Sequence, residues 1–299
     1  MKFDKYEWTA ISIMVSLFIL VGFVQSWSVS LVILNMCIIS AIMTMGVNIS
    51  WGYAGVINFG VMGFLAMGGL AAVLVSYPPI KESWQVGGFG LGISFILLVS
   101  LVTAVYFINK LVEKKSHKYW LNGLVIFFGL LIIRYFFLNA TSKIEEVDPA
   151  LAGFLGGANL PIIFSWVVGG FFAAGVAFII GKVALGLRSD YLAIVTLGIS
   201  EIVVSVLKHE EWLSRGVKNV IGLKRPVPYE INLQSSDWFI NLVIWFNSSK
   251  LNQIIDLDQK QQILNNLIIN SSSLLVKLNY AILFFIVMII IYYFANKAQ

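Results

Sequence analysis

Residues 48–70 read NISWGYAGVINFGVMGFLAMGGL, an apolar stretch that glycine and asparagine interrupt. In hydrocarbon, an unpaired backbone amide or carbonyl group is so costly that irregular backbone persists only beside protein or a water-filled cavity. Glycine permits backbone conformations that other residues avoid. The stretch therefore favours a broken or re-entrant membrane segment near 48–60, of the kind that binds solutes in many transporters. Plain packing of small residues between helices is the alternative.

The composition places the rest of the chain in a membrane as well. Of 299 residues, 59% are hydrophobic and 12% are charged, whereas soluble domains carry roughly 25% charged residues. We therefore expect an all-α polytopic membrane protein. The formal net charge of +5 is small, and no basic, aromatic-rich soluble module is present, so we expect no nucleic-acid binding. The single cysteine, Cys37, excludes an internal disulfide and a cysteine-based zinc site.

Hydropathy predicts about eight transmembrane helices, because a span needs roughly 20 apolar residues. The windows are 9–26, 29–49, 57–77, 89–109, 119–138, 162–181, 190–207 and 278–296. The first window follows a charged N-terminus without a convincing cleavage site, so we interpret it as a retained span. The whole chain, 1–299, is expected to form a single transmembrane domain.

Lysine and arginine in short loops predict the orientation of these spans. They gather in 110–118 and 182–189, which the positive-inside rule assigns to the cytoplasm, and acidic residues dominate 140–161, which is then outside. With eight spans, both termini are then cytoplasmic. If 29–77 is instead one discontinuous element, the N-terminus lies outside and the rest of the topology is unchanged.

The polar segment 208–277 is expected to be a large extracytoplasmic loop. Its tryptophans beside charged residues suit the headgroup interface, and docking of a partner protein is a second interpretation. Asp256 or Asp258 is positioned to cap a short amphipathic helix that runs through residue 270.

A second informative block, LRSDYLAIVTLGISEI, covers residues 187–202. Glu201 lies about ten residues into an otherwise apolar span, where an ionisable group usually faces a cavity or a partner. Thr196 and Glu201 are five positions apart, about 140° around a helix, so they do not share a face. Glu201 could relay protons, or its carboxylate could form a structural hydrogen bond to a neighbouring helix. We favour the structural hydrogen bond, because no second acidic residue or histidine is placed to exchange protons with Glu201.

Catalytic patterns are absent from the sequence. It contains no G-x-x-x-x-G-K-[ST], no G-x-S-x-G and no H-E-x-x-H motif. We therefore expect no enzyme activity, no cofactor and no metal site. If a nucleotide powers this protein, the ATP site is on another chain.

Taken together, residues 48–69 and 187–202 resemble the signatures of permease subunits of branched-chain amino acid ABC importers, of the LivM/LivH type and closer to LivM. The resemblance covers about 30–223. The chain departs from the family pattern at Val61, where histidine is frequent, at Ser189, where glycine is common, and at Gly68-Gly69-Leu70. It also ends before the family's ATPase-coupling loop, so we expect a domain that is incomplete at its C-terminus.

The resemblance implies a multi-pass subunit of a prokaryotic inner membrane that forms a translocation path for branched-chain, hydrophobic amino acids. The implied partners are a second permease subunit, cytoplasmic ABC ATPase subunits, an extracytoplasmic substrate-binding protein, a small amino acid substrate and membrane lipid. The residues expected along the substrate path are Gly52, Tyr53, Gly55, Asn58, Gly60, Tyr191, Thr196 and Glu201. The alternatives are a urea or amide permease of the same family, a secondary transporter or channel, and an inactive truncated remnant.

Overall fold

The computed structural model describes residues 5–112, 115–150, 152–184, 186–253 and 256–297, and within them all regular structure is helical. Six of the described helical stretches are long and apolar enough to cross a membrane: Trp27–Tyr53, Lys81–Leu111, Ser116–Glu145, Ile162–Ala184, Asp190–His209 and Leu257–Lys297. Three shorter apolar helices accompany them: Trp8–Val24, Val61–Ser76 and Asp237–Phe246. Each of the eight hydropathy windows falls largely within a helix, so the expected all-α polytopic membrane protein is confirmed.

The chain divides into two compact units, Met1–Asn58 with Arg225–Gln299 and Phe59–Lys224. The helices of the first unit are α1 (Lys5–Val24), α2 (Trp27–Asn48), the π-helix η1 (Ile49–Tyr53), α9 (Glu230–Gln234), α10 (Asp237–Phe246), α11 (Ser248–Leu251) and α12 (Leu257–Lys297). Those of the second unit are α3 (Val61–Ser76), α4 (Lys81–Leu111), α5 (Lys115–Glu145), α6 (Ile162–Ala184), α7 (Ser189–His209) and α8 (Glu211–Ser214).

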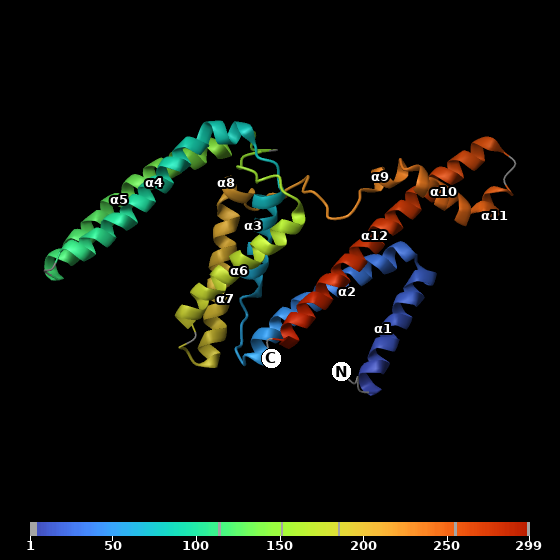
Figure 1. Ribbon diagram of the computed structural model, residues 1–299, viewed down its shortest axis with the longest axis horizontal. Coiled ribbons are helices and arrows are strands. Elements are labelled where there is room, and N and C mark those ends of the chain that lie inside the picture. The colour runs from blue at the N-terminus through green and yellow to red at the C-terminus, as the bar shows by residue number, and fades with distance from the viewer. Residues whose placement is uncertain (1–4, 113–114, 151, 185, 254–255, 298–299) are drawn as a thin grey trace. The chain divides into compact units, whose positions relative to one another are not determined.

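In the first unit, α2 packs against both α1 and α12 (Figure 1). Ser26 begins α2 as its N-cap, since its hydroxyl accepts a hydrogen bond from the amide of Val29 at 3.2 Å. Between α1 and α2, the hydroxyl of Ser30 donates to the carbonyl of Phe18 at 2.8 Å. Between α2 and α12, the side-chain amide of Asn35 donates to the carbonyl of Lys277 at 3.0 Å. Polar bonds between helices thus fix the packing of otherwise apolar surfaces.

Much of the 208–277 segment, expected as a large extracytoplasmic loop with one short helix, is helical. Asp256 caps α12 as expected, because its carboxylate accepts a hydrogen bond from the amide of Asp258 at 3.1 Å. The helix does not end at residue 270, however, but continues to Lys297, so the expectation of a short separate helix was wrong. With 41 residues, α12 is about 60 Å long, roughly twice the thickness of a hydrocarbon core.

The N-terminal half of α12 carries a small apolar core. Short helices α9 and α10 pack against it, and the buried residues at the contact are Val227, Leu233, Phe239, Val243, Ile268 and Val276. A hydrogen bond of 2.9 Å from the Gln234 side-chain amide to the hydroxyl of Ser272 joins α9 to α12. The polar sequence before the last span is therefore an ordered helical layer.

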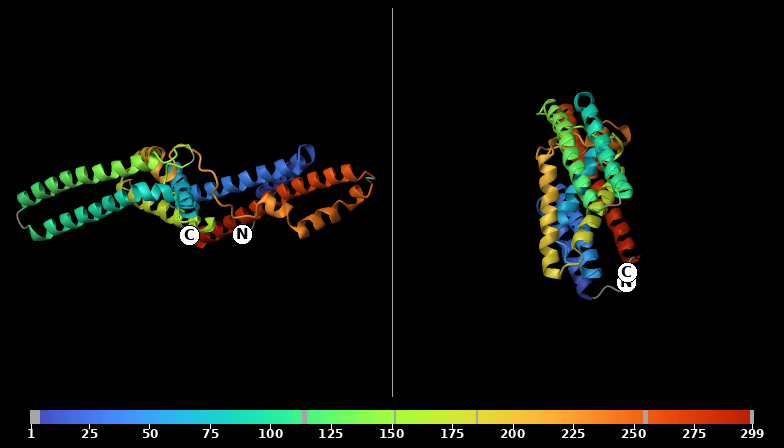
Figure 2. Two further views of the ribbon diagram at one scale, coloured as in Figure 1. Left: turned by 90° about the horizontal axis from the view of Figure 1, so that it is seen from above. Right: turned by 90° about the vertical axis from the view of Figure 1, so that its left-hand side faces the viewer.

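In the second unit, α3 packs against both α6 and α7, and α4 and α5 form a long antiparallel hairpin (Figures 1 and 2). Glycines allow the hairpin helices to approach closely, as is common between membrane helices. A Cβ atom at Gly87 would lie 2.2 Å from the Ile144 side chain, and one at Gly90 would lie 2.8 Å from the Cβ of Ala140. The hairpin is thus a closely packed pair along its own length.

Candidate functional site

The break predicted near 48–60 is present after the π-helix η1. The helix ends where the amide of Val56 bonds to the carbonyl of Ser50 at 2.9 Å, and Gly55 takes a positive φ of 65° that favours glycine. Residues 54–60 are not helical, and α3 begins at Val61. Within η1, a Cβ atom at Gly52 would lie 2.2 Å from the Asn48 side-chain oxygen. Gly55 therefore has a conformational reason to be glycine, whereas a side chain at Gly52 would require the Asn48 side chain to move.

The start of α3 is held by two hydroxyl groups of α7. The backbone amide of Phe59 donates to the hydroxyl of Thr196 at 3.2 Å, and the amide of Gly63 donates to the hydroxyl of Ser200 at 2.7 Å. The first amides of a helix lack partners within that helix, and the N-cap residue Gly60 gives no side-chain cap. The Gly63 amide also donates to the carbonyl of Gly60 at 3.2 Å, so the neighbouring helix supplies acceptors in addition to those within the segment.

The hydroxyls on α7 are fully enclosed. Thr196 is 2% exposed and Ser200 is 1% exposed, and the Thr196 hydroxyl also donates to the carbonyl of Ala193 at 2.9 Å. Gly63 brings the two helices together, since a Cβ atom there would lie 3.1 Å from the Cα of Ser200. This contact joins the two sequence blocks singled out above, residues 48–70 and 187–202, in one packed and hydrogen-bonded site, which we call the α3–α7 contact.

The structure separates the predicted path residues into three groups. Gly52, Tyr53, Gly55 and Asn58 lie in the first unit, at or just after the end of the long α2–η1 helix. Gly60 and Thr196 belong to the second unit; Gly60 is the N-cap of α3, and Thr196 holds the preceding residue Phe59. Tyr191 and Glu201 lie on the exposed side of α7.

Ser200 is a site residue that sequence reasoning missed. It lies four positions after Thr196, a spacing that places both hydroxyls on one helical face. It occupies the interhelical position that we had expected for Glu201. Among the described residues, Glu201 makes no hydrogen bond or ion pair, and its side chain is exposed. Thr196 is buried and Glu201 is exposed, as expected for two residues that do not share a helical face.

A polar stripe follows the exposed side of α7. Its members recur at helical spacing and are exposed within the second unit: Glu201, Ser205 and Lys208, with Gly198 on the same side of the helix. A Cβ atom at Gly198 would meet nothing within 4 Å. Polar groups at membrane depth usually face a water-filled cavity or a protein partner rather than lipid. The two sides of α7 therefore differ: one holds α3, and the other carries the polar stripe beside exposed apolar side chains such as Ile202 and Val206.

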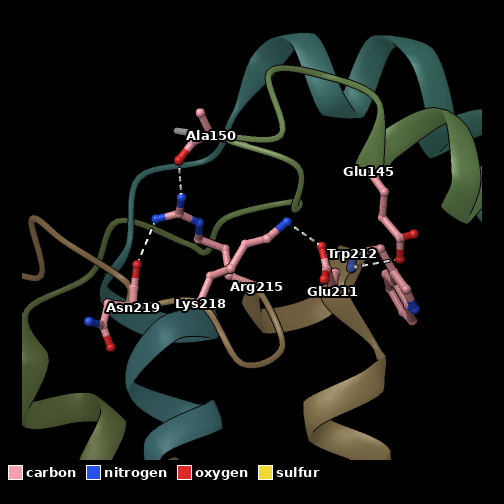
Figure 3. A network of polar contacts seen from close by, with 7 residues as sticks. All are labelled: Glu145, Ala150, Glu211, Trp212, Arg215, Lys218 and Asn219. Atoms are coloured by element: carbon pink, nitrogen blue, oxygen red, sulfur yellow. Dashed lines mark hydrogen bonds and ion pairs between the residues drawn. The ribbon is translucent and has the colours of Figure 1, made fainter.

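Loops at the C-terminal end of α7 are tied together by the buried side chain of Arg215 (Figure 3). Its guanidinium donates to the carbonyl of Asn219 at 2.6 Å and to the carbonyl of Ala150. Nearby, the Trp212 amide donates to Glu145 at 3.3 Å. These bonds join the loop after α5 to α8 and the loop after it, so hydrogen bonds connect the loops at this end of the second unit.

The described residues contain no group of three or more His, Cys, Asp or Glu that could hold a metal ion. Fold and site together define an all-α multi-pass membrane protein in which a broken helix packs on a helix with an outward polar stripe. Comparison of the chain with models of protein families, with curated proteins and with solved structures gave no match.

Proposed function

We propose that this chain is a membrane-spanning permease subunit of an ABC importer for branched-chain, hydrophobic amino acids, powered by separate ATPase subunits. One observation supports the proposal above the others: the two blocks that carry the family resemblance meet in the α3–α7 contact. Thr196 and Ser200 hold the amides of Phe59 and Gly63. A resemblance that arose by chance would not require the two blocks to pack together.

In this proposal, the broken segment contributes backbone to the solute path. The positive end of the α3 dipole is at its N-terminus, directly after the break, and would favour the carboxylate of a zwitterionic amino acid. Thr196 and Ser200 would keep this helix end in place as positioning residues. Gly52, Tyr53, Gly55 and Asn58 stay predicted path residues at the first half of the break.

The polar stripe on α7 would face the solute path or the second permease subunit. Glu201 is exposed near the middle of an apolar span, a position where a carboxylate facing lipid is costly. A second subunit in the membrane would remove that cost by covering the stripe or by enclosing water beside it. ATP binding on cytoplasmic subunits would then switch the path between outward and inward access.

Reconstitution in proteoliposomes tests this function. The chain is co-reconstituted with a candidate second permease subunit and candidate ABC ATPase subunits from the same genome, and a candidate binding protein is supplied outside. We expect ATP-dependent uptake of radiolabelled leucine, isoleucine or valine. Uptake of urea or a short amide instead would overturn the proposed amino acid substrate but support the assignment as an ABC permease. No uptake of any of these solutes, with the ATPase active, would overturn the permease assignment.

The exposed Glu201 also favours a second candidate, a secondary transporter or channel. In that case a proton or ion gradient alone would drive flux through the purified chain, without ATPase. The substitution Glu201→Gln would abolish the coupled flux, because glutamine cannot carry a proton as carboxylate does. ATP dependence of the uptake by the unsubstituted protein would rule this candidate out.

A further inference from the structure

Helix α10 is apolar on both its buried and its exposed sides. On the buried side, Phe239 and Val243 are each 2% exposed and pack against α12. On the exposed side, large apolar side chains remain uncovered, and Trp245 and Phe246 are 71% and 68% exposed. The only charged residue of the helix is Asp237, at its first position. A helix whose outer side is this apolar is unlike one that faces water.

The first unit itself marks the level of the membrane surface. Helices α1 and α2 are both apolar, so the turn that joins them, at Gln25 and Ser26, lies at one surface of the bilayer. Just past this turn, the ammonium group of Lys277 donates to the hydroxyl of Ser28. Lys277 on α12 is therefore near the boundary between hydrocarbon and water.

Helix α10 packs on α12 close to this level. The α12 residues in the shared core are Ile268 and Val276, which precede Lys277 by nine positions and by one. At 1.5 Å per residue along α12, the contact with α10 extends from about 14 Å above Lys277, at Ile268, down to the level of Lys277, at Val276. This distance places α10 beside the headgroup region, which adds several ångströms to each side of the hydrocarbon core.

The exposed edge of α10 is continuous with the lipid-facing surface of the spanning helices. A groove of about 390 Å³ is lined by Trp238, Leu242 and Phe246 of α10 together with Leu31 of α2 and Leu278 of α12. No charged side chain lines this groove. Leu31 and Leu278 lie just inside the membrane boundary, so the surface passes from the spanning helices onto α10 as a largely apolar one, with Asn247 and Ser271 as its polar lining residues.

We propose that α10 is an interfacial helix whose exposed side binds the boundary between lipid headgroups and acyl chains. Tryptophan and phenylalanine on its outer side suit this environment, because aromatic rings are favoured at the membrane interface. A lipid partner fits the continuity of the groove with the spanning helices and the absence of charged residues along it better than a protein partner does. The segment before the last span is thus partly membrane-bound.

Spin labels on the full-length protein test the proposal. In a Cys37→Ser background, which removes the single cysteine, a nitroxide is attached to Trp245→Cys. Matched labels are attached to Ile289→Cys, on the exposed side of the last span, and to Asp258→Cys, at the distal end of α12. The proteins are reconstituted in phosphatidylcholine–phosphatidylglycerol vesicles. Collision rates with oxygen, which enters lipid, and with a nickel chelate, which stays in water, are measured.

We expect the oxygen-to-nickel collision ratio at position 245 to be several-fold above that at position 258 and to approach that at position 289. A ratio equal to that at 258 would show a water-exposed helix and overturn the proposal. Low collision rates with both reagents would show that protein covers α10, either a partner or a second copy, and would also overturn it. A label on Trp238→Cys repeats the measurement if the first variant is not monodisperse in detergent.

Discussion

Replacing Gly63 with alanine tests the α3–α7 contact most directly. The new Cβ atom would lie 3.0 Å from the hydroxyl oxygen and 3.1 Å from the Cα of Ser200. The hydroxyl can rotate away but the Cα belongs to the backbone of α7, so the helices must separate by a few tenths of an ångström. Overpacking of this kind costs about 1–3 kcal/mol, whereas alanine gains about 1 kcal/mol in helix propensity. We expect a net loss of up to about 2 kcal/mol in the free energy of unfolding.

Gly69→Ala is the matched control on the same helix. A Cβ atom at Gly69 meets nothing within 4 Å, so only the propensity gain applies, and the variant should be as stable as the parent or up to about 1 kcal/mol more stable. Unfolding by dodecyl sulfate in mixed micelles, followed by circular dichroism, gives both values. If Gly63→Ala is as stable as Gly69→Ala, the close approach of α3 and α7 is not as described, and the reasoning fails.

Three further predictions concern the same unit. Ser200→Ala removes a buried acceptor and should lower the free energy of unfolding by about 1 kcal/mol. Its control, Ser205→Ala on the exposed stripe, should change the free energy of unfolding by less than about 0.5 kcal/mol. Equal effects of the two substitutions would contradict the hydrogen bond from α3 to Ser200. Arg215→Ala should lower the free energy of unfolding by about 2 kcal/mol and speed proteolysis of the loop between α5 and α6, because two carbonyls lose a charged donor. Its control, Lys218→Ala, loses only an exposed ion pair with Glu211 and should lower the free energy of unfolding by less than about 1 kcal/mol. Glu201→Gln should leave stability within about 0.5 kcal/mol of the parent and, for an ABC permease, should preserve ATP-driven uptake measured with radiolabelled leucine.

Hydropathy located the spanning helices because the bilayer leaves the backbone few choices. A spanning segment must satisfy its own amides and carbonyls, so an apolar window of sufficient length becomes a helix. The same reasoning located the interruption after Tyr53, where glycine and asparagine recur. It did not locate the first half of α12. That half contains Gln, Asn and Ser in place of apolar residues, and its stability comes from α9 and α10 packing on Ile268 and Val276.

The candidate site was predictable only in part. Thr196 stood out as a hydroxyl in an apolar span, and its i+4 neighbour Ser200 could have been found from the same helical spacing. Glu201 drew attention because carboxylates are rare at membrane depth, yet the buried contact belongs to the residue before it. Arg215 gave no signal at all in the sequence, since burial of an arginine in a loop depends on carbonyls distant along the chain, such as that of Ala150.

The pairing of α2 with α12 also constrains the order in which the protein is made. Ser28 and Asn35 bond to Lys277, which is 249 and 242 residues later in the chain, and all of the second unit is synthesised between them. At about 5–20 residues per second, α1 and α2 wait roughly 12–50 s in the membrane before α12 emerges. During that interval the side chain of Asn35 lacks its final acceptor. An insertase or lipid environment that shelters this hairpin would therefore raise the yield of the folded protein.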